Sequence, residues 1–283
     1  DRTDMLVNLR ADADALETIF RVGTSAGGAR AKVLIAWNPR SNDIRSGQVP
    51  PPPGFEPWIM KFDSVEDRSV GSSKGYGRVE YAYNRMAVSA GIEMSPCRLF
   101  EENGSAHFMT RRFDRGRNNE KIHLQSLCAL AHFDFNMAGA YSYEQALSTI
   151  QQLNFGYDTL AGMYRRMVFN IFARNQDDHT KNVSFLMTGD GAWKLAPAFD
   201  VIWAYSTAGP WMNQHQMTVN GKRDNLTKDD LLAVARQYGI KNASAILDQV
   251  SEAVSLWPQV AAESGVSGPT IRRIGSTHRL HIR

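Results

Sequence analysis

The clearest hydrophobic pattern in the chain lies at positions 160–172, where apolar residues recur at the spacing of one helical face. The members of this face are Leu160, Met163, Tyr164, Met167, Val168, Ile171 and Phe172. Apolar positions that recur at i, i+3, i+4 and i+7 are typical of an amphipathic helix. We therefore predict a buried helix that leads directly into the polar segment 175–182.

Apolar runs in the first part of the chain predict strands at 32–37 and 58–62, since both are rich in β-forming residues. The pattern before the first run indicates a short helix at 11–20 and a glycine-containing turn at 23–29. Four consecutive prolines at 50–53 break regular structure between the two runs. We therefore expect a loop there, with the prolines in an exposed insertion.

A helix is predicted over 80–90, because Ala82, Met86 and Ala90 share one face and Gly91 follows at the usual stop position. Further strands are expected at 97–99 and 106–110. The pattern of the sequence changes from strand-like to helix-like after about residue 116, and the remainder is predicted to be mainly helical.

Three elements stand out within that second part. A hairpin is predicted from the runs 183–187 and 192–195, which flank a Gly-Asp-Gly turn. A helix is expected to begin at Thr227, where Asp230 completes a start that resembles a capping box. Another is expected from near 243 to 257, ending before a proline.

Composition bounds the class of protein. The chain has 283 residues, 43% hydrophobic and 22% charged, which is enough for one large domain or two lobes. The formal charge of +3 gives no reason to expect a surface that binds nucleic acid or membrane as a whole. Cys97 and Cys128 are too few for a zinc cage or a disulfide framework, so a cytoplasmic location is expected. The chain begins without Met, and we expect a trimmed or partial sequence.

The glycine-containing turn is a candidate phosphate cradle. Gly23, Gly27 and Gly28 carry no Cβ, so backbone N–H groups there can approach phosphate oxygens. Small-residue loops between strands are, however, more often plain turns, and this segment alone does not decide between the two.

Lys61 stands inside the apolar run 58–62. A buried ammonium is costly unless an opposite charge meets it, and either an ATP phosphate or Glu80 on the following helix would serve. The alternative is an ordinary lysine on the exposed side of an edge strand.

The segment 175–182 is more specific. Asp177 and Asn182 have the five-residue spacing of a kinase catalytic loop, in which the aspartate orients or deprotonates the acceptor hydroxyl and the asparagine binds magnesium. Asp200, farther along, would chelate the metal that bridges the phosphates. The alternatives are a solvated loop at the end of a helix, or a metal site using His179, for which no second ligand motif is evident.

In their order, these motifs resemble the HipA-like serine/threonine kinases, the toxin halves of bacterial toxin–antitoxin pairs. The matching segments are 23–32, 58–61, 112–115, 175–182 and 195–200. The resemblance covers nearly the whole chain. It implies an α+β, two-lobed protein-kinase-like fold related to phosphatidylinositol kinases. A β-rich N-lobe would span 1–112 and a mainly helical C-lobe 113–283.

The resemblance also implies that ATP binds between the lobes with magnesium, and that adenine lies near 111–113. It assigns catalysis to Asp177 and Lys61, and metal binding to Asn182 and Asp200. The implied ATP-binding residues are Gly23, Ser25, Ala26, Gly27, Gly28, Lys32, Lys61, Arg111, Phe113, His179 and Lys181. Ser25 matches the serine that the family autophosphorylates, and a phosphate there would compete with ATP and switch the kinase off.

The partners that the resemblance implies are a small helix-turn-helix antitoxin like HipB, in a complex that binds DNA, and a protein substrate such as an aminoacyl-tRNA synthetase. Relatives usually carry a further subdomain upstream of the glycine turn, so a separate small protein could supply it in a split system. Two rival functions stay open: an inactive kinase-like module that binds nucleotide or antitoxin, and a small-molecule or lipid kinase.

Overall fold

The computed structural model of the chain describes residues 31–63, 66–67, 71–72, 75–102, 104–116, 119–207 and 212–282. The helix expected at 11–20 and the glycine turn at 23–29 lie outside this part. Contacts divide the chain into two compact units. Unit 1 comprises Asp1–Tyr81 and Ser95–Lys121, and unit 2 comprises Ala82–Met94 and Ile122–Arg283. A lobe boundary after residue 112 stays a prediction.

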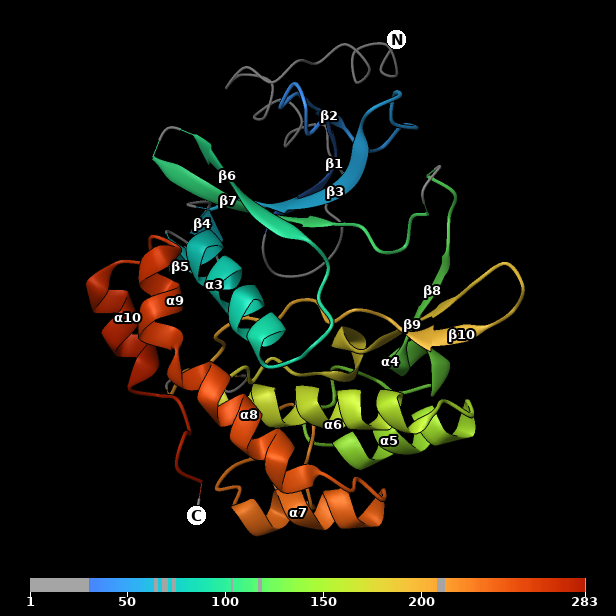
Figure 1. Ribbon diagram of the computed structural model, residues 1–283, viewed down its shortest axis with the longest axis vertical. Helices are drawn as coiled ribbons and strands as arrows, with labels where there is room; N and C mark the ends of the chain where they lie inside the picture. The colour runs from blue at the N-terminus through green and yellow to red at the C-terminus, as the bar shows by residue number, and fades with distance from the viewer. Residues whose placement is uncertain are drawn as a thin grey trace. The chain divides into compact units, whose positions relative to one another are not determined.

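Unit 1 is built on a five-stranded antiparallel sheet with the order β2-β1-β3-β7-β6 (Figure 1). The strands are β1 (Lys32–Trp37), β2 (Ile44–Ser46), β3 (Glu56–Lys61), β6 (Cys97–Glu102) and β7 (Ser105–Arg111). A second sheet pairs β4 (Glu66–Asp67) with β5 (Gly71–Ser72). The four predicted strands are confirmed.

Strand β2 corrects the expectation of a continuous loop between β1 and β3. Its three residues are too few to show a period of two in the sequence. They pair with β1, and Ile44 is completely buried, so the strand is set by tertiary contacts.

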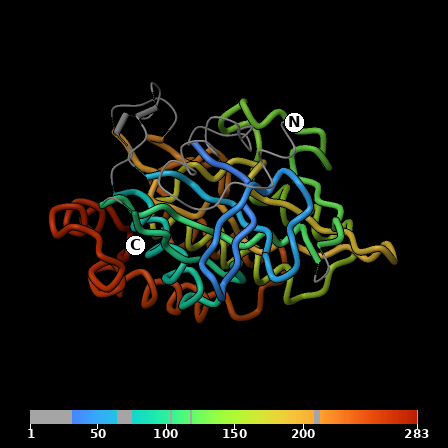
Figure 2. Tube along the Cα trace, turned by 90° about the horizontal axis from the view of Figure 1, so that it is seen from above, coloured from blue at the N-terminus to red at the C-terminus, as the bar shows by residue number. Residues whose placement is uncertain are grey.

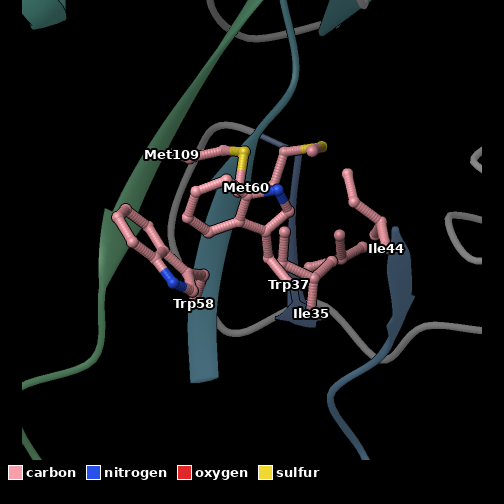
Figure 3. Close-up of a cluster of buried hydrophobic side chains, with 7 residues drawn as sticks. Ile35, Trp37, Ile44, Trp58, Met60 and Met109 are labelled. Atoms are coloured by element: carbon pink, nitrogen blue, oxygen red, sulfur yellow. The ribbon is translucent and has the colours of Figure 1, made fainter. Parts of the chain in front are cut away.

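The core of unit 1 lies on one face of this sheet. Alternate residues of β1 and β3 point the same way, and their side chains meet Met109 of β7 and Ile44 of β2 (Figure 3). The cluster comprises Val33, Ile35, Trp37, Ile44, Trp58, Met60 and Met109. Trp37 and Trp58 meet edge to face, with ring centroids 5.3 Å apart. Because side chains alternate along a strand, Lys61 stands on the face opposite to this cluster.

Helix α3 (Tyr76–Ser89) begins in unit 1 and ends in unit 2. It starts four residues before the predicted position, since Gly77 packs so closely on β7 that a Cβ atom there would overlap the carbonyl oxygen of Ala106. The predicted stop is confirmed, because Gly91 adopts a positive φ of 77° directly after the helix.

Unit 2 is mainly helical. Its α-helices among the described residues are α4 (Leu127–Leu130), α5 (Tyr143–Gln152), α6 (Tyr157–Phe172), α7 (Lys228–Gln237), α8 (Ala243–Ser255), α9 (Trp257–Glu263) and α10 (Gly268–Gly275). Helix α6 is the helix that the 160–172 pattern predicts, and it packs against α5 and α8 (Figure 1). Every residue of the predicted face is buried.

Helix boundaries follow local chemistry. The capping box of Thr227 and Asp230 at the start of α7 is confirmed. A second box, from Ser142 and Gln145, starts α5, a helix that the sequence interpretation missed although the motif is legible. The helix expected over 243–257 is two helices, α8 and α9. The break falls before Pro258, which has no N–H and is tolerated in the first turn of α9.

A three-stranded sheet interrupts the helices of unit 2, with the order β10-β9-β8. The hairpin of β9 (Ser184–Met187) and β10 (Trp193–Leu195) is confirmed. Strand β8 (His123–Ser126) was not expected, because it has only one apolar residue and half of it is exposed. Helices α9 and α10 lie at the opposite end of unit 2 from this sheet (Figures 1 and 2). In the described part, no helix is long and apolar enough to cross a membrane.

Candidate active site

Lys61 ends β3, the central strand of the unit 1 sheet, and is only 9% exposed. Its ammonium forms an ion pair with the carboxylate of Glu80 on α3. The ring of Phe108, its partner in register on β7, lies 5.7 Å from the same nitrogen. Lys61 is therefore not on an edge strand, and Glu80 is one of the two partners considered for it.

A hydrogen-bond chain ties the end of β3 to the start of α3. The backbone N–H of Asp63 donates to Nδ1 of His107 at 2.9 Å. His107 must then carry its proton on Nε2, which lies 3.1 Å from the carboxylate of Glu102. One carboxylate oxygen of Asp63 accepts from the N–H of Gly75, at 3.1 Å. This chain holds together the two elements that carry Lys61 and Glu80.

The remaining predicted residues of unit 1 flank this pair differently. Lys32 lies directly opposite Lys61 in the β1–β3 register. Arg111 is half exposed, with its Nε 3.8 Å from Glu56 at the far end of β3. Phe113 is half-buried in a turn that Arg112 closes through two hydrogen bonds, of 2.9 and 2.6 Å, to Asp114.

The loop of unit 2 that carries Asp177 begins where α6 ends. Asp177 has a side chain that is 57% exposed, so its carboxylate is accessible to a substrate. Asn182 Nδ2 donates to the backbone oxygen of Asp177 at 2.8 Å. This hydrogen bond uses the amide nitrogen, so the amide oxygen of Asn182 is not the group that binds the loop. The predicted pair is thus brought together within one loop.

The neighbouring carboxylate, Asp178, is fully buried beneath that loop. It accepts hydrogen bonds from the Tyr143 hydroxyl at 2.7 Å and from the backbone N–H of Gln216 at 2.7 Å, and it lies 2.8 Å from Nδ1 of His215. Burial raises the pKa of Asp178, but attraction to His215 and these hydrogen bonds together hold it below its ordinary value. The site therefore keeps a buried negative charge behind Asp177.

Further polar contacts extend this network into α6. Asn170 Nδ2 donates to the Tyr143 hydroxyl, and Asn175 Nδ2 donates to the Asn170 side-chain oxygen, both at 2.9 Å. Neither His215 nor Tyr143 is among the site residues that the sequence predicts. Nothing local marks either residue, because both are 35 or more positions away from Asp178.

Asp200 follows β10 and has a positive φ of 52°, an unusual conformation for a residue with a side chain. Its neighbours Phe199 and Val201 line a cavity of about 30 Å³ together with Asn182 and His179. Residues beside Asp177 and beside Asp200 therefore line one cavity within unit 2, although Asp177 and Asp200 themselves are not among its lining residues.

His179 and Lys181 lie on the same loop. Nε2 of His179 is 3.8 Å from the carboxylate of Asp177. The ammonium of Lys181 lies 4.6 Å above the ring of Phe135, a cation–π contact on the surface of unit 2. Their assignment to ATP stays a prediction.

The donor set fits a hard divalent cation. Asn182 offers an amide oxygen and Asp200 a carboxylate, and magnesium is usually held by one or two such groups plus phosphates and water. No group of three or more His, Cys, Asp or Glu residues that could hold a metal occurs among the described residues. Gly23, Ser25, Ala26, Gly27 and Gly28 lie outside the described part of the chain.

The model of the HipA-like C-terminal domain family matches residues 24–257, most of the chain. A relative in Sinorhizobium fredii, provisionally named as the kinase Y4mE, is 23% identical over 189 residues. That alignment covers 60% of this chain and 44% of the relative, so the chain spans less than half the length of the curated protein it matches.

A chain in the structure of the Shewanella oneidensis MR-1 toxin–antitoxin complex of HipA, HipB and operator DNA superimposes with a TM-score of 0.70. The superposition covers 94% of this chain and 68% of that one, at 16% sequence identity. The fold is therefore the α+β, two-lobed kinase-like fold that the sequence predicts.

Proposed function

Since the chain belongs to the family of HipA-like C-terminal domains, we propose that it is a kinase that transfers phosphate from ATP to serine or threonine hydroxyls of proteins. The observation that carries this proposal is the loop geometry of unit 2. An exposed aspartate stands five residues before an asparagine whose amide is fixed by the aspartate's own carbonyl. Phosphoryl transfer needs such positioning more than it needs covalent chemistry from the protein.

In this proposal the oxygen of the acceptor hydroxyl attacks the γ-phosphorus of ATP, and Asp177 accepts the proton of that hydroxyl. The bond from that phosphorus to the β,γ-bridging oxygen breaks, and ADP leaves. The high exposure of Asp177 keeps its carboxylate accessible to the acceptor hydroxyl, as this role requires. The buried charge of Asp178 and its hydrogen bonds hold the loop while the proton moves.

Lys61 contributes a fixed cation for the phosphates, and Glu80 keeps its ammonium oriented. Asn182 and Asp200 would hold magnesium, which neutralises negative charge on the phosphates when it is bound. We further propose that Lys32, Arg111, Phe113, His179 and Lys181 line the nucleotide site. The same proposal extends to the glycine turn at 23–28, in which Ser25 is the autophosphorylated residue.

The toxin role is also a proposal. The Shewanella complex contains HipA with HipB and operator DNA. By this likeness we propose that the present chain is part of a toxin that a helix-turn-helix antitoxin similar to HipB neutralises. Gel filtration of the chain with a helix-turn-helix antitoxin similar to HipB would test this, and separate elution of the two proteins would contradict it.

The rival functions differ in the acceptor of the phosphate. Incubation with γ-labelled ATP and magnesium should place label on protein, on Ser25 of the chain itself or on a second protein. Label found only on metabolites or lipids would favour a small-molecule kinase. Bound nucleotide with no transfer would favour an inactive binding module. Comparative phosphoproteomics after brief expression of wild-type and Asp177→Asn chains would then identify the substrate.

A further inference from the structure

The segment 277–279, which follows α10, makes direct contacts with the base of the loop that carries Asp177. The backbone N–H of Arg279 donates to the oxygen of Phe172, the last residue of α6, at 2.8 Å. Nε of Arg174 donates to the backbone oxygen of Thr277 at 2.9 Å. Arg174 has a positive φ of 57°, and this turn sets the direction in which the chain enters the loop.

The same segment holds the stretch that follows Asp200. Nε1 of Trp203 donates to the hydroxyl of Thr277 at 3.0 Å, and that hydroxyl donates its own proton to the oxygen of Ile274 at 2.7 Å. The guanidinium of Arg273 lies 4.7 Å above the ring of Trp203. Trp203 is therefore fixed by two residues from the end of α10 and the segment that follows it.

The two stretches held in this way are also joined to each other. The N–H of Gln176 donates to the oxygen of Ala204, and the N–H of Ala204 donates to the oxygen of Arg174, both at 3.0 Å. The guanidinium of Arg174 stacks 4.3 Å above the ring of Tyr205. The base of the Asp177 loop and the segment after Asp200 thus form one short ladder, and residues 277–279 lie against both of its sides.

His278 and Arg279 complete the attachment. The Tyr83 hydroxyl gives its proton to the oxygen of Ala173 at 2.6 Å, so its oxygen can accept from Nε2 of His278, 3.0 Å away. The guanidinium of Arg279 pairs with Asp224, whose carboxylate is also 3.7 Å from Arg174. All of these side chains are buried or half-buried.

We propose that Thr277, His278 and Arg279 form a clasp of positioning residues that sets the spacing between Asp177 and Asp200. This inference rests on the proposed phosphoryl transfer, because those two residues act in that reaction. None of the three clasp residues touches the nucleotide in this proposal. Their effect is to hold the ladder of 174–176 and 203–205 in one register.

The sharpest test removes the hydroxyl of Thr277, and with it the hydrogen bond from Trp203 and the hydrogen bond to Ile274. Thr277→Val keeps the shape of the side chain and removes the acceptor for Trp203, whereas Thr277→Ser keeps that acceptor. Thr270→Val is the matched control, because the hydroxyl of Thr270 is in α10 and accepts only an exposed hydrogen bond from Ser267. Arg279→Gln forms a second pair with the control Arg272→Gln, an exposed position.

Two readouts separate the clasp from the kinase proposal. Hydrogen exchange at the amides of Gln176 and Ala204 reports the ladder without any need for activity. In Thr277→Val this exchange should become about tenfold faster, beyond what any loss of global stability explains. In steady-state kinetics kcat should fall about 10- to 100-fold while the KM for ATP stays within about twofold. Thr277→Ser should recover both values.

Unchanged exchange in Thr277→Val and Arg279→Gln, relative to their controls, would overturn the clasp whatever the activity. Faster exchange together with an unchanged kcat would overturn its role in positioning. A wild-type chain without any phosphoryl transfer would overturn the kinase proposal, and with it the catalytic part of the clasp, while the exchange data would still decide whether the clasp holds the ladder.

Discussion

The carboxylate of Asp178 lies 2.8 Å from Nδ1 of His215, and both side chains are completely shielded from solvent. Asp178 is the chain neighbour of the exposed Asp177. The carboxylate of Asp178 is therefore held inside the protein, and that of Asp177 lies at the surface. A buried carboxylate keeps its charge only while its hydrogen-bond donors stay in place.

The hydroxyl of Tyr143 is one of these donors. Tyr143→Phe removes the 2.7 Å hydrogen bond to Asp178 and the acceptor of Asn170. We expect a loss of about 1.5–3 kcal/mol in the free energy of unfolding, because a buried charge loses a partner. Urea denaturation measures this loss. Tyr157→Phe is the control, since that hydroxyl lies at an exposed helix end, and an equal loss in both variants would contradict the account.

Gly77 fixes the position of α3 on the sheet of unit 1. In Gly77→Ala the added methyl group would overlap the oxygen of Ala106, so the helix must shift and carry Glu80 away from Lys61. We expect a destabilisation of about 1–3 kcal/mol and weaker nucleotide binding. Gly162→Ala is the control inside α6, where a Cβ meets no atom within 4 Å and should stabilise the helix by about 0.5–1 kcal/mol. Equal effects of the two substitutions would refute the packing argument.

The ion pair of Lys61 and Glu80 should separate stability from nucleotide binding. Lys61→Met leaves the carboxylate of Glu80 buried without its cation, a change that typically costs about 3–5 kcal/mol. Adding Glu80→Gln to Lys61→Met should recover much of the lost stability but not the affinity for ATP. Differential scanning calorimetry measures the stability, and isothermal titration calorimetry measures the affinity. Lys194→Met, at an exposed position of β10, is the control. Recovery of ATP binding in the double variant would remove Lys61 from the site.

His278 predicts how stability depends on pH. Burial, and secondarily the charge of Arg174, lower the pKa of His278 from 6.5 to about 4. The folded chain keeps this histidine neutral while the unfolded chain binds a proton below its ordinary pKa. The contribution of His278 to the free energy of unfolding is therefore fully present above about pH 6.5. It falls by up to about 3 kcal/mol as pH decreases to about 4.

Urea denaturation across this pH range measures the loss. His278→Gln keeps a donor near the Tyr83 hydroxyl but cannot be protonated, so most of the loss should disappear in this variant. The pKa of Asp178 is held below its ordinary value, and its contribution is lost only at lower pH, as pH falls through that depressed pKa. An identical pH dependence of the wild type and His278→Gln would show that His278 does not titrate as its burial implies.

The parts of this fold that can be predicted from the sequence are those in which the local hydrophobic pattern matches the burial of the residues. Helix α6 was predicted because positions 160–172 carry a single continuous apolar face. Strands β2 and β8 were missed because three or four residues, paired by tertiary contacts, carry no period of their own. Helix α5 was missed although its capping box is legible.

The site divides in the same way. The closeness of Asp177 and Asn182 could be predicted, because they are only five residues apart on one loop. Their catalytic and metal-binding roles stay a proposal. The support of Asp178 by His215 could not be predicted, since the two residues are 37 positions apart and only the fold brings them together. The segment 277–279 gave no signal at all, because Phe172, Arg174 and Trp203, which it contacts, are more than 70 positions away in sequence.

The most direct measurement of the central claim is mass spectrometry of the chain and its protein substrates after incubation with ATP and magnesium, for the wild type and for Asp177→Asn. The wild type should gain phosphate, and Asp177→Asn should slow the transfer at least about 100-fold, as expected for loss of a catalytic base. Its melting temperature should not change, because the side chain of Asp177 is 57% exposed. Phosphate transfer by Asp177→Asn at the wild-type rate, or a wild type that binds ATP and transfers none, would contradict the account.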